Sequence, residues 1–346
     1  MKAGQRILVT GAAGYIGSTL VRELLASGFR VLAVDRMYFG EKALADLMKN
    51  PAFALLRTDV CRIEPQHLRG VHAVVDLAGI ADDQATELDP VWTDTINHRA
   101  RVRLATLARA AGVTRHVLIS STAVYGQVSG AEVDETASPR PLNLASQAAV
   151  QAEQGCLALA RPGFSPTALR LGTVYGLSPR MRFDLLVNSM TLSAYRHRSI
   201  MLQEAGWQSQ PHVHVQDVAR AVLAALKVPT ERMHGEIFNI GQINLRARDI
   251  ADIVRDVLGN SVSLHDDCAS PELPDVRARF GKAVLQLGWQ PRGSFYTAVH
   301  EIATALAAGK VLDTPETYTL QWYKHLRTCE QAIRTGHDCS ASRTVH

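Results

Sequence analysis

Three glycines near the start of the chain have the spacing of a phosphate-binding turn. The apolar run Ile7-Leu8-Val9-Thr10 leads directly into Gly11-Ala-Ala-Gly14-Tyr-Ile-Gly17, and a helical pattern follows. Such a turn needs small residues, because a diphosphate must touch backbone amides at the positive end of the helix. The third glycine lets the helix pack closely on the strand. The motif predicts a dinucleotide diphosphate site made of Gly11, Ala13, Gly14, Tyr15, Ile16 and Gly17.

Acidic residues follow the second and third predicted strands. Asp35 lies about 20 residues beyond the glycines, where a carboxylate accepts hydrogen bonds from ribose hydroxyls. Its charge repels a 2′-phosphate, which predicts NAD rather than NADP as the cofactor. Arg36 comes next and leaves open the alternative that an arginine holds that phosphate. Asp59 and Val60 are predicted to bracket the adenine, and a simple turn at a strand end is the alternative.

Further motifs follow in a fixed order along the chain. They are Leu77-Ala78-Gly79, Asn97, Ser120-Ser121-Thr122-Ala-Val-Tyr125-Gly126, Arg170-x-Gly-Thr-Val-Tyr175-Gly176 and His212-Val-His214. With them the sequence resembles the extended short-chain dehydrogenase/reductases, the NAD-dependent epimerase/dehydratase group that modifies nucleotide-linked sugars. The resemblance implies that Leu77, Ala78, Gly79 and Asn97 lie beside the cofactor. It also implies that Ser121 and Thr122 belong to the catalytic strand, with the Ser121 hydroxyl on the substrate.

The resemblance also implies a Tyr-x-x-x-Lys pair, which this chain lacks. In the family the tyrosine relays a proton, and the lysine lowers its pKa and holds the nicotinamide ribose. The aligned stretch here reads Asn143-Leu-Ala-Ser146-Gln147, with Glu153 downstream supporting the register. Asn143 and Gln147 therefore occupy the catalytic positions, and Gln147 occupies the lysine's place on the cofactor. An amide does not relay protons near neutral pH. The rate enhancement of about 10²–10⁴-fold that general acid–base catalysis typically supplies is therefore missing from these two positions.

Two interpretations follow from the missing pair. In the first, the protein is an enzyme on a nucleotide sugar whose proton is moved by another group. The candidates for that group are Asp82, Asp83, His98, Tyr125 and His214. In the second, it is a catalytically silent relative that binds NAD or a nucleotide sugar and acts as a regulator or partner subunit. We favour the enzyme with changed chemistry, because Ser121 and the motifs of the substrate domain persist.

For the substrate, the resemblance implies a nucleoside diphosphate held by the second half of the chain. Asn188 is expected on the diphosphate, with Arg180 and Arg182 adding positive charge. Gln210 stands where many relatives carry an arginine, and Arg277 is a candidate to compensate for it. An altered sugar pocket is therefore expected.

The elements that must position these residues alternate between strands and helices. Strands are predicted at 6–10, 30–35, 53–58, 73–77, 116–120 and 166–171, and long helices at 97–111 and 143–159. Apolar runs of this kind indicate a parallel sheet covered on both faces. We predict an α/β fold, with a Rossmann-type doubly wound parallel sheet and a smaller C-terminal α/β substrate domain. The predicted NAD-binding domain is 1–178, with 212–245 returning to it. The substrate domain is mainly 179–325, and 326–346 is predicted to be a flexible tail.

Composition narrows the class of partner. The chain has 346 residues, a net charge of +4 and no long basic run, which favours a small anionic ligand over nucleic acid. Five cysteines without metal-ligand spacing indicate reduced thiols and no metal site. No apolar run approaches the ~18 residues of a membrane span, so we expect a soluble, cytoplasmic protein. The resemblance implies a homodimer built through the two long helices.

Overall fold

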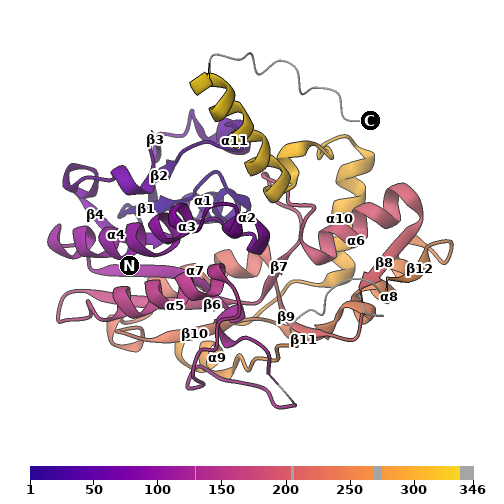
Figure 1. The fold of residues 1–346 in the computed structure, drawn as a ribbon. Coiled ribbons are helices and arrows are strands. Elements are labelled where there is room, and N and C mark those ends of the chain that lie inside the picture. The colour runs from indigo at the N-terminus through magenta and orange to yellow at the C-terminus, as the bar shows by residue number, and fades with distance from the viewer. Residues whose placement is uncertain (129, 204–205, 268–274, 336–346) are drawn as a thin grey trace.

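A seven-stranded sheet forms the centre of the larger lobe. The computed structural model describes residues 1–128, 130–203, 206–267 and 275–335. The strands are β1 (Arg6–Thr10), β2 (Arg30–Asp35), β3 (Phe53–Arg57), β4 (Val71–Asp76), β5 (Arg115–Ser121), β6 (Ser165–Leu171) and β10 (Ile237–Ile240). They run in the order β10-β6-β5-β4-β1-β2-β3, and all neighbours are parallel (Figure 1).

Helices cover both faces of this sheet. Ile7 and Val9 pack in one core with α1 (Tyr15–Ala26) and α7 (Val215–Lys227). Leu8 packs in the other with α4 (Ala100–Ala110) and α5 (Leu144–Leu157). Successive side chains of a strand point to opposite faces, so one apolar run feeds two cores. The predicted doubly wound α/β fold is confirmed.

The strand order explains where a site can form. β1 lies between β2 and β4. Strands β2 and β3 follow on one side of β1, and the next strands, from β4 onward, lie on its other side. In open parallel sheets such a reversal leaves a crevice at the carboxyl ends of the strands. The residues that follow β1, β2, β4 and β5 therefore meet at one edge.

A smaller lobe has its own core. It contains α6 (Leu186–His197), α8 (Ala247–Leu258), α10 (Phe295–Ala307) and the paired parallel strands β8 (Ser199–Gln203) and β12 (Ser263–Asp267) (Figure 1). A three-stranded sheet has the order β11-β9-β7, with β7 (Thr173–Tyr175), β9 (Ser209–His214) and β11 (Ile243–Arg246). Shorter helices are α2 (Asp83–Glu87), α3 (Pro90–Asp94) and α9 (Gly281–Leu287).

The last described residues of the chain form a helix. Helix α11 (Thr319–Thr335) includes residues 326–335, which were predicted to belong to a flexible tail. Residues 336–346, with Cys339, lie outside the described residues, as does Cys268. In the described ranges, no helix has both the length and the apolar character needed to cross a membrane. Cys61, Cys156 and Cys329 are free cysteines.

Candidate functional site

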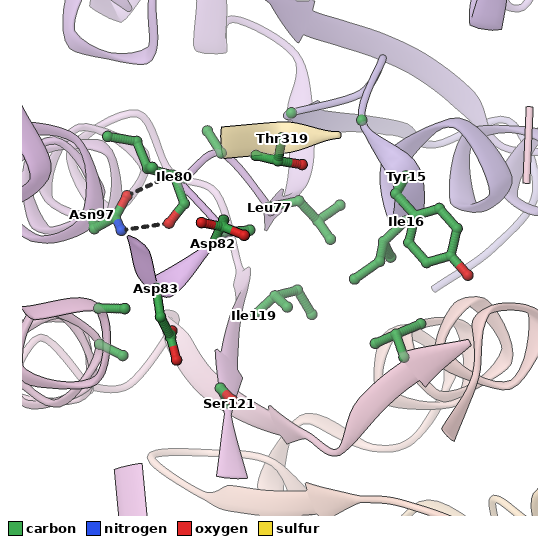
Figure 2. Close-up of a pocket in the computed structure, with 18 of the residues that line it drawn as sticks. Tyr15, Ile16, Leu77, Ile80, Asp82, Asp83, Asn97, Ile119, Ser121 and Thr319 are labelled. Carbon is green, nitrogen blue, oxygen red and sulfur yellow. Dashed lines mark hydrogen bonds between the residues drawn. The ribbon is translucent and has the colours of Figure 1, made fainter. Parts of the chain in front are cut away.

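A cavity of about 840 Å³ opens at the carboxyl edge of the sheet (Figure 2). This volume lies within the range of about 300–1,000 Å³ that small-molecule sites occupy. Its walls come from the glycine turn after β1, from the ends of β2 to β6, and from α2 and the first residues of α11. Most of the side chains singled out in the sequence line it.

The glycine turn packs so closely that side chains are excluded. A Cβ at Gly17 would lie 2.1 Å from the Gly11 carbonyl oxygen, and one at Gly11 would lie 2.9 Å from the Leu77 carbonyl carbon. Gly14 is the N-cap of α1 and supplies no capping side chain. The first amides of α1 are therefore left for a ligand, and the helix end is electropositive. This cradle fits the diphosphate of a dinucleotide.

The Asp35 carboxylate is fixed by two backbone amides. It accepts hydrogen bonds from Ala13 at 2.9 Å and from Met37 at 2.7 Å. Burial raises the pKa of Asp35, and the two amides counteract that rise. Asp35 lines the cavity, whereas Ala13 does not and contributes through its amide. The turn after β1 and the end of β2 are thereby locked together.

Arg36 is engaged with protein partners. Its Nη1 lies 2.8 Å from Asp59, and its guanidinium lies 4.4 Å from the centre of the Tyr38 ring. Asp59 also accepts the Cys61 amide at 2.7 Å, and the pKa of Asp59 is lowered by the Cys61 and Arg36 hydrogen bonds, which outweigh its burial. Because Asp59 offsets the Arg36 charge, this corner is a poorer site for a 2′-phosphate. Arg36, Asp59 and Val60 all line the cavity.

The loop after β4 is held from two sides. Thr10 Oγ1 donates to Asp76 at 2.6 Å and accepts the amides of Leu77 and Ala78 at 3.1 and 3.0 Å. This places the backbone of that loop beside the glycine turn. Sequence reasoning did not single out Thr10, and its only signal was a polar residue ending an apolar strand.

Asn97 clamps the same loop one step further on. Its Oδ1 accepts the Ile80 amide at 2.8 Å, and its Nδ2 donates to the Ile80 carbonyl at 3.0 Å (Figure 2). Asn97 lies in a π-helical segment, Thr95–Arg99, that precedes α4, where the sequence predicted the start of the helix. Both Asn97 and Gly79 line the cavity. Asn97 thus acts on the loop that carries Gly79.

Strand β5, which carries Ser120 and Ser121, ends at the cavity. Ser121, the last residue of β5, accepts the Ala123 amide on its Oγ at 3.1 Å and lines the cavity (Figure 2). Thr122 also lines it, and its Oγ1 donates to the Leu171 carbonyl at 3.1 Å. Ser121 is therefore the more available of the two hydroxyls.

Asn143, which the sequence predicts at the family's tyrosine position, is the N-cap of α5. Its Oδ1 accepts the Ser146 amide at 2.9 Å, and Asn143 lines the cavity together with Asp83. Burial and the neighbouring Asp82 raise the pKa of Asp83, while the nearby Asn143 amide counteracts them. Gln147 is exposed and does not line the cavity.

The other four candidates for proton transfer differ in whether they line the cavity. Asp82 lines the cavity and caps α2 by accepting the Ala85 amide at 2.8 Å. The remaining three are engaged outside it. His98 pairs with Asp94 at 2.8 Å, Tyr125 donates to Asn239 at 2.8 Å, and His214 caps α7 by accepting the Gln216 amide at 3.2 Å. Only Asp82 and Asp83 of the five reach the site.

The two arginines after β7 have different surroundings. Arg182 makes two bonds of 2.9 Å to Asp184 and one of 3.0 Å to the Ala81 carbonyl. Arg180 stacks on Phe39 with its guanidinium 3.7 Å from the ring centre. Burial lowers the pKa of Arg180 to about 10, and the nearby Arg182 adds to this. Both line the cavity, and Arg180 lies at its Asp35 end.

The remaining predicted substrate residues divide between wall and interior. Gln210 lines the cavity and accepts the Thr173 hydroxyl at 3.0 Å. Asn188 is fully buried. Its amide bonds the Gly176 amide, the Arg182 carbonyl and the Tyr15 hydroxyl. Arg277 is half exposed, lies 3.9 Å from Asp275 and is outside the cavity. The structure thus makes Asn188 a core residue.

A buried ion pair fixes α5 behind the serine strand. Glu153 receives three hydrogen bonds of 2.6–3.2 Å from Arg170 and one of 2.5 Å from Ser120. The pair ties α5 to β5 and β6, and so sets the position of Asn143 relative to Ser121. In the sequence Glu153 served only as a marker of register.

Comparison with known proteins agrees with this geometry. The model of the NAD dependent epimerase/dehydratase family matches residues 7–241. UDP-glucuronic acid decarboxylase 1 of Arabidopsis thaliana is 28% identical over 298 residues, 83% of this chain and 66% of that protein. The chain thus spans just under two thirds of that relative.

Solved structures with similar folds contain ligands. MoeE5 in complex with UDP-glucuronic acid and NAD is 28% identical with a TM-score of 0.76, covering 88% of this chain and 99% of that one. UDP-glucuronic acid 4-epimerase from Bacillus cereus, with the same two ligands, is 25% identical with a TM-score of 0.79 and the same coverage. NAD as the cofactor is confirmed.

Proposed function

The chain belongs to the NAD dependent epimerase/dehydratase family, and we propose that it converts a nucleotide-linked sugar with Asp83 as the proton-transfer group. The observation that carries the proposal is that Asp83 lines the same cavity as Asn143, the residue that the sequence assigns to the family's tyrosine position. Asp83, Asn143 and Ser121 line one cavity with the glycine turn. A titratable group is thus present beside the place that the tyrosine has left.

The cofactor would be held by the cradle described above. The glycine turn would bind the diphosphate, Asp35 the adenosine ribose, and the Leu77-Ala78-Gly79 backbone would lie beside the rest. NAD, when bound, supplies a hydride acceptor. Every other requirement falls on the chain: binding and orienting the sugar, and moving one proton.

Asp83 has the properties of a general base. Burial and Asp82 raise its pKa, which brings a carboxylate closer to the pKa range useful for catalysis. Its ionised carboxylate takes the proton from a sugar hydroxyl, and the protonated acid returns it in the reverse step. The Asn143 amide orients the carboxylate, and the Ser121 hydroxyl contacts the same sugar oxygen. In Figure 2 the Asp83 carboxylate points toward the end of β5 that carries Ser121.

The names of the relatives support a UDP-linked sugar as the substrate. Two solved relatives bind UDP-glucuronic acid, and a third relative is named as its decarboxylase. Gln210 replaces the arginine expected at the substrate, so the sugar or its nucleotide differs in that contact. Homodimer formation through α4 and α5, and a cytoplasmic location, stay predictions.

A specific observation favours the silent relative as the second candidate. Asn143 is engaged as a helix cap and Gln147 is exposed, so neither member of the family's pair survives in function. Such a protein would bind NAD and nucleotide sugar without converting them.

One experiment separates the two candidates. The full chain is incubated with NAD and either UDP-glucuronic acid or UDP-glucose, and products are followed by NMR and NADH absorbance. We expect turnover that falls about 10²–10⁴-fold in Asp83→Asn. Asp256→Asn, an exposed aspartate on α8 outside the cavity, is the control and should keep its rate. Binding of both ligands without turnover would support the silent relative, and an active Asp83→Asn variant would exclude Asp83.

A further inference from the structure

The start of helix α11 forms part of the cavity wall. Thr319, Leu320, Gln321 and Tyr323 line the cavity together with the glycine turn. Figure 2 shows Thr319 over the middle of the cavity, between Ile80 and the segment that carries Tyr15 and Ile16. The family match ends at residue 241, so this wall comes from a later part of the chain. The Thr319 amide at the start of this helix donates to the Asp184 carboxylate at 3.0 Å.

Helix α11 is anchored on the residues that follow β2. Tyr323 is only 6% exposed. Its ring meets Tyr38, Phe39 and Trp92 edge-on at centre distances of 6.1, 5.5 and 5.5 Å. Trp322 Nε1 donates to the Tyr38 carbonyl at 2.6 Å. These contacts hold α11 against the end of the cavity where Asp35 lies.

Arg180 joins α11 to this end of the cavity. Its Nη2 donates to the Glu316 carbonyl and the Thr319 hydroxyl, both at 3.3 Å. Its Nε has no partner, and the residue is 8% exposed. Phe39 covers one face of its guanidinium.

The other arginines of the cavity wall are neutralised. The ion pairs are Arg36–Asp59 at 2.8 Å, Arg101–Asp76 at 3.4 Å and Arg182–Asp184 at 2.9 Å. Among the described residues, no carboxylate lies within 4.0 Å of the Arg180 nitrogens. A buried cation without a counter-ion is costly, and an anionic ligand in the cavity removes that cost.

We propose that Arg180, held by the first turn of α11, forms a second diphosphate contact for the dinucleotide, and that Tyr323 anchors this segment as a clasp that slows cofactor release. The glycine turn then supplies backbone amides, and the clasp supplies a charged donor. Charge-assisted bonds of a guanidinium to phosphate are among the stronger hydrogen bonds in proteins. The proposal concerns binding alone and holds whether or not Asp83 transfers a proton.

Calorimetry with three probes tests the Arg180 contact. NAD, ADP and adenosine are titrated into the full-length wild type, Arg180→Gln and Arg180→Lys. We expect Arg180→Gln to bind NAD and ADP about 10- to 100-fold more weakly, with adenosine within about twofold, and Arg180→Lys to recover part of the loss. Unchanged ADP binding in Arg180→Gln would overturn the proposal. An equal loss for adenosine would also overturn it, because the residue would then only shape the pocket.

A kinetic measurement tests the clasp. We expect NAD to leave Tyr323→Ala at least about tenfold faster than wild type in stopped-flow displacement, equivalent to losing about 1.4 kcal/mol of the barrier. Lys324→Ala, an exposed neighbour on α11, is the matched control and should release NAD at the wild-type rate. Unchanged release from Tyr323→Ala, or tighter NAD binding with faster association, would overturn the clasp.

Thr319→Val removes only the hydroxyl that Arg180 contacts, and it keeps the test of the Arg180 contact decisive if Arg180→Gln fails to fold. It should weaken ADP binding a few-fold, and no change would count against the proposal.

Discussion

Replacing Gly17 by alanine should separate the packing of the glycine turn from its ligand contact. The added Cβ would lie 2.1 Å from the Gly11 oxygen and 2.8 Å from the Ala12 Cα, both backbone atoms that cannot rotate away. Helix α1 must therefore move off the turn. Overpacking costs typically about 1–3 kcal/mol and sometimes more, and two such contacts place this variant at about 3 kcal/mol or above. At Gly14 the nearest atom is 3.1 Å away, so Gly14→Ala should cost less than about 1 kcal/mol.

The assay pairs urea unfolding with NAD titration for both variants. Gly17→Ala should lose both stability and NAD affinity, because the amides at the start of α1 shift with the helix. Gly14→Ala should keep its unfolding free energy and lose mainly affinity, since its methyl group faces the diphosphate site. A Gly17→Ala protein with wild-type stability would refute the close packing on which this reasoning depends.

Two further substitutions probe the surroundings of the site. Glu153→Gln leaves the Arg170 guanidinium buried without its counter-ion, so urea unfolding should show a loss of about 3–5 kcal/mol, and a loss below about 1 kcal/mol would contradict the role of the pair. Asp82→Asn keeps the cap of α2 but removes a negative charge that raises the pKa of Asp83. Removing that charge favours ionised Asp83 and lowers its pKa, so the acidic limb of the kcat profile should move to lower pH. A shift to higher pH would exclude Asp83 as the base.

The sheet was predictable because its strands are buried on both faces. All six strands predicted in the sequence are present, and β1 and β2 have the predicted bounds. β7, β8, β9, β11 and β12 escaped prediction, because their sequences lack a continuous apolar run. β12 reads Ser-Leu-His-Asp-Asp, and β9 contains Pro211 and two histidines. Such strands are defined by their partners rather than by their own apolar pattern.

The site was predictable where a residue follows a buried strand and unpredictable where it depends on a distant element. Asp35, Ser121 and the glycine turn lie at strand ends, whose position follows from the sheet. Asn188 and Gln147 illustrate the limit, because a motif gives the residue and not the direction of its side chain. The wall formed by α11 had no motif at all, since it arises from the packing of Tyr323 on Tyr38, Phe39 and Trp92.

Asn143, the residue predicted to replace the family's tyrosine, has a local structural role. Asparagine is among the best N-cap residues, and here it starts α5 with a reciprocal bond to Ser146. The same side chain also counteracts the rise in the pKa of Asp83, a residue of α2 that lines the same cavity. Along the sequence the substitution reads only as the loss of a proton-transfer group. In three dimensions it couples the cap of α5 to a carboxylate with a raised pKa, so the substitution of a catalytic residue does not by itself imply a silent protein.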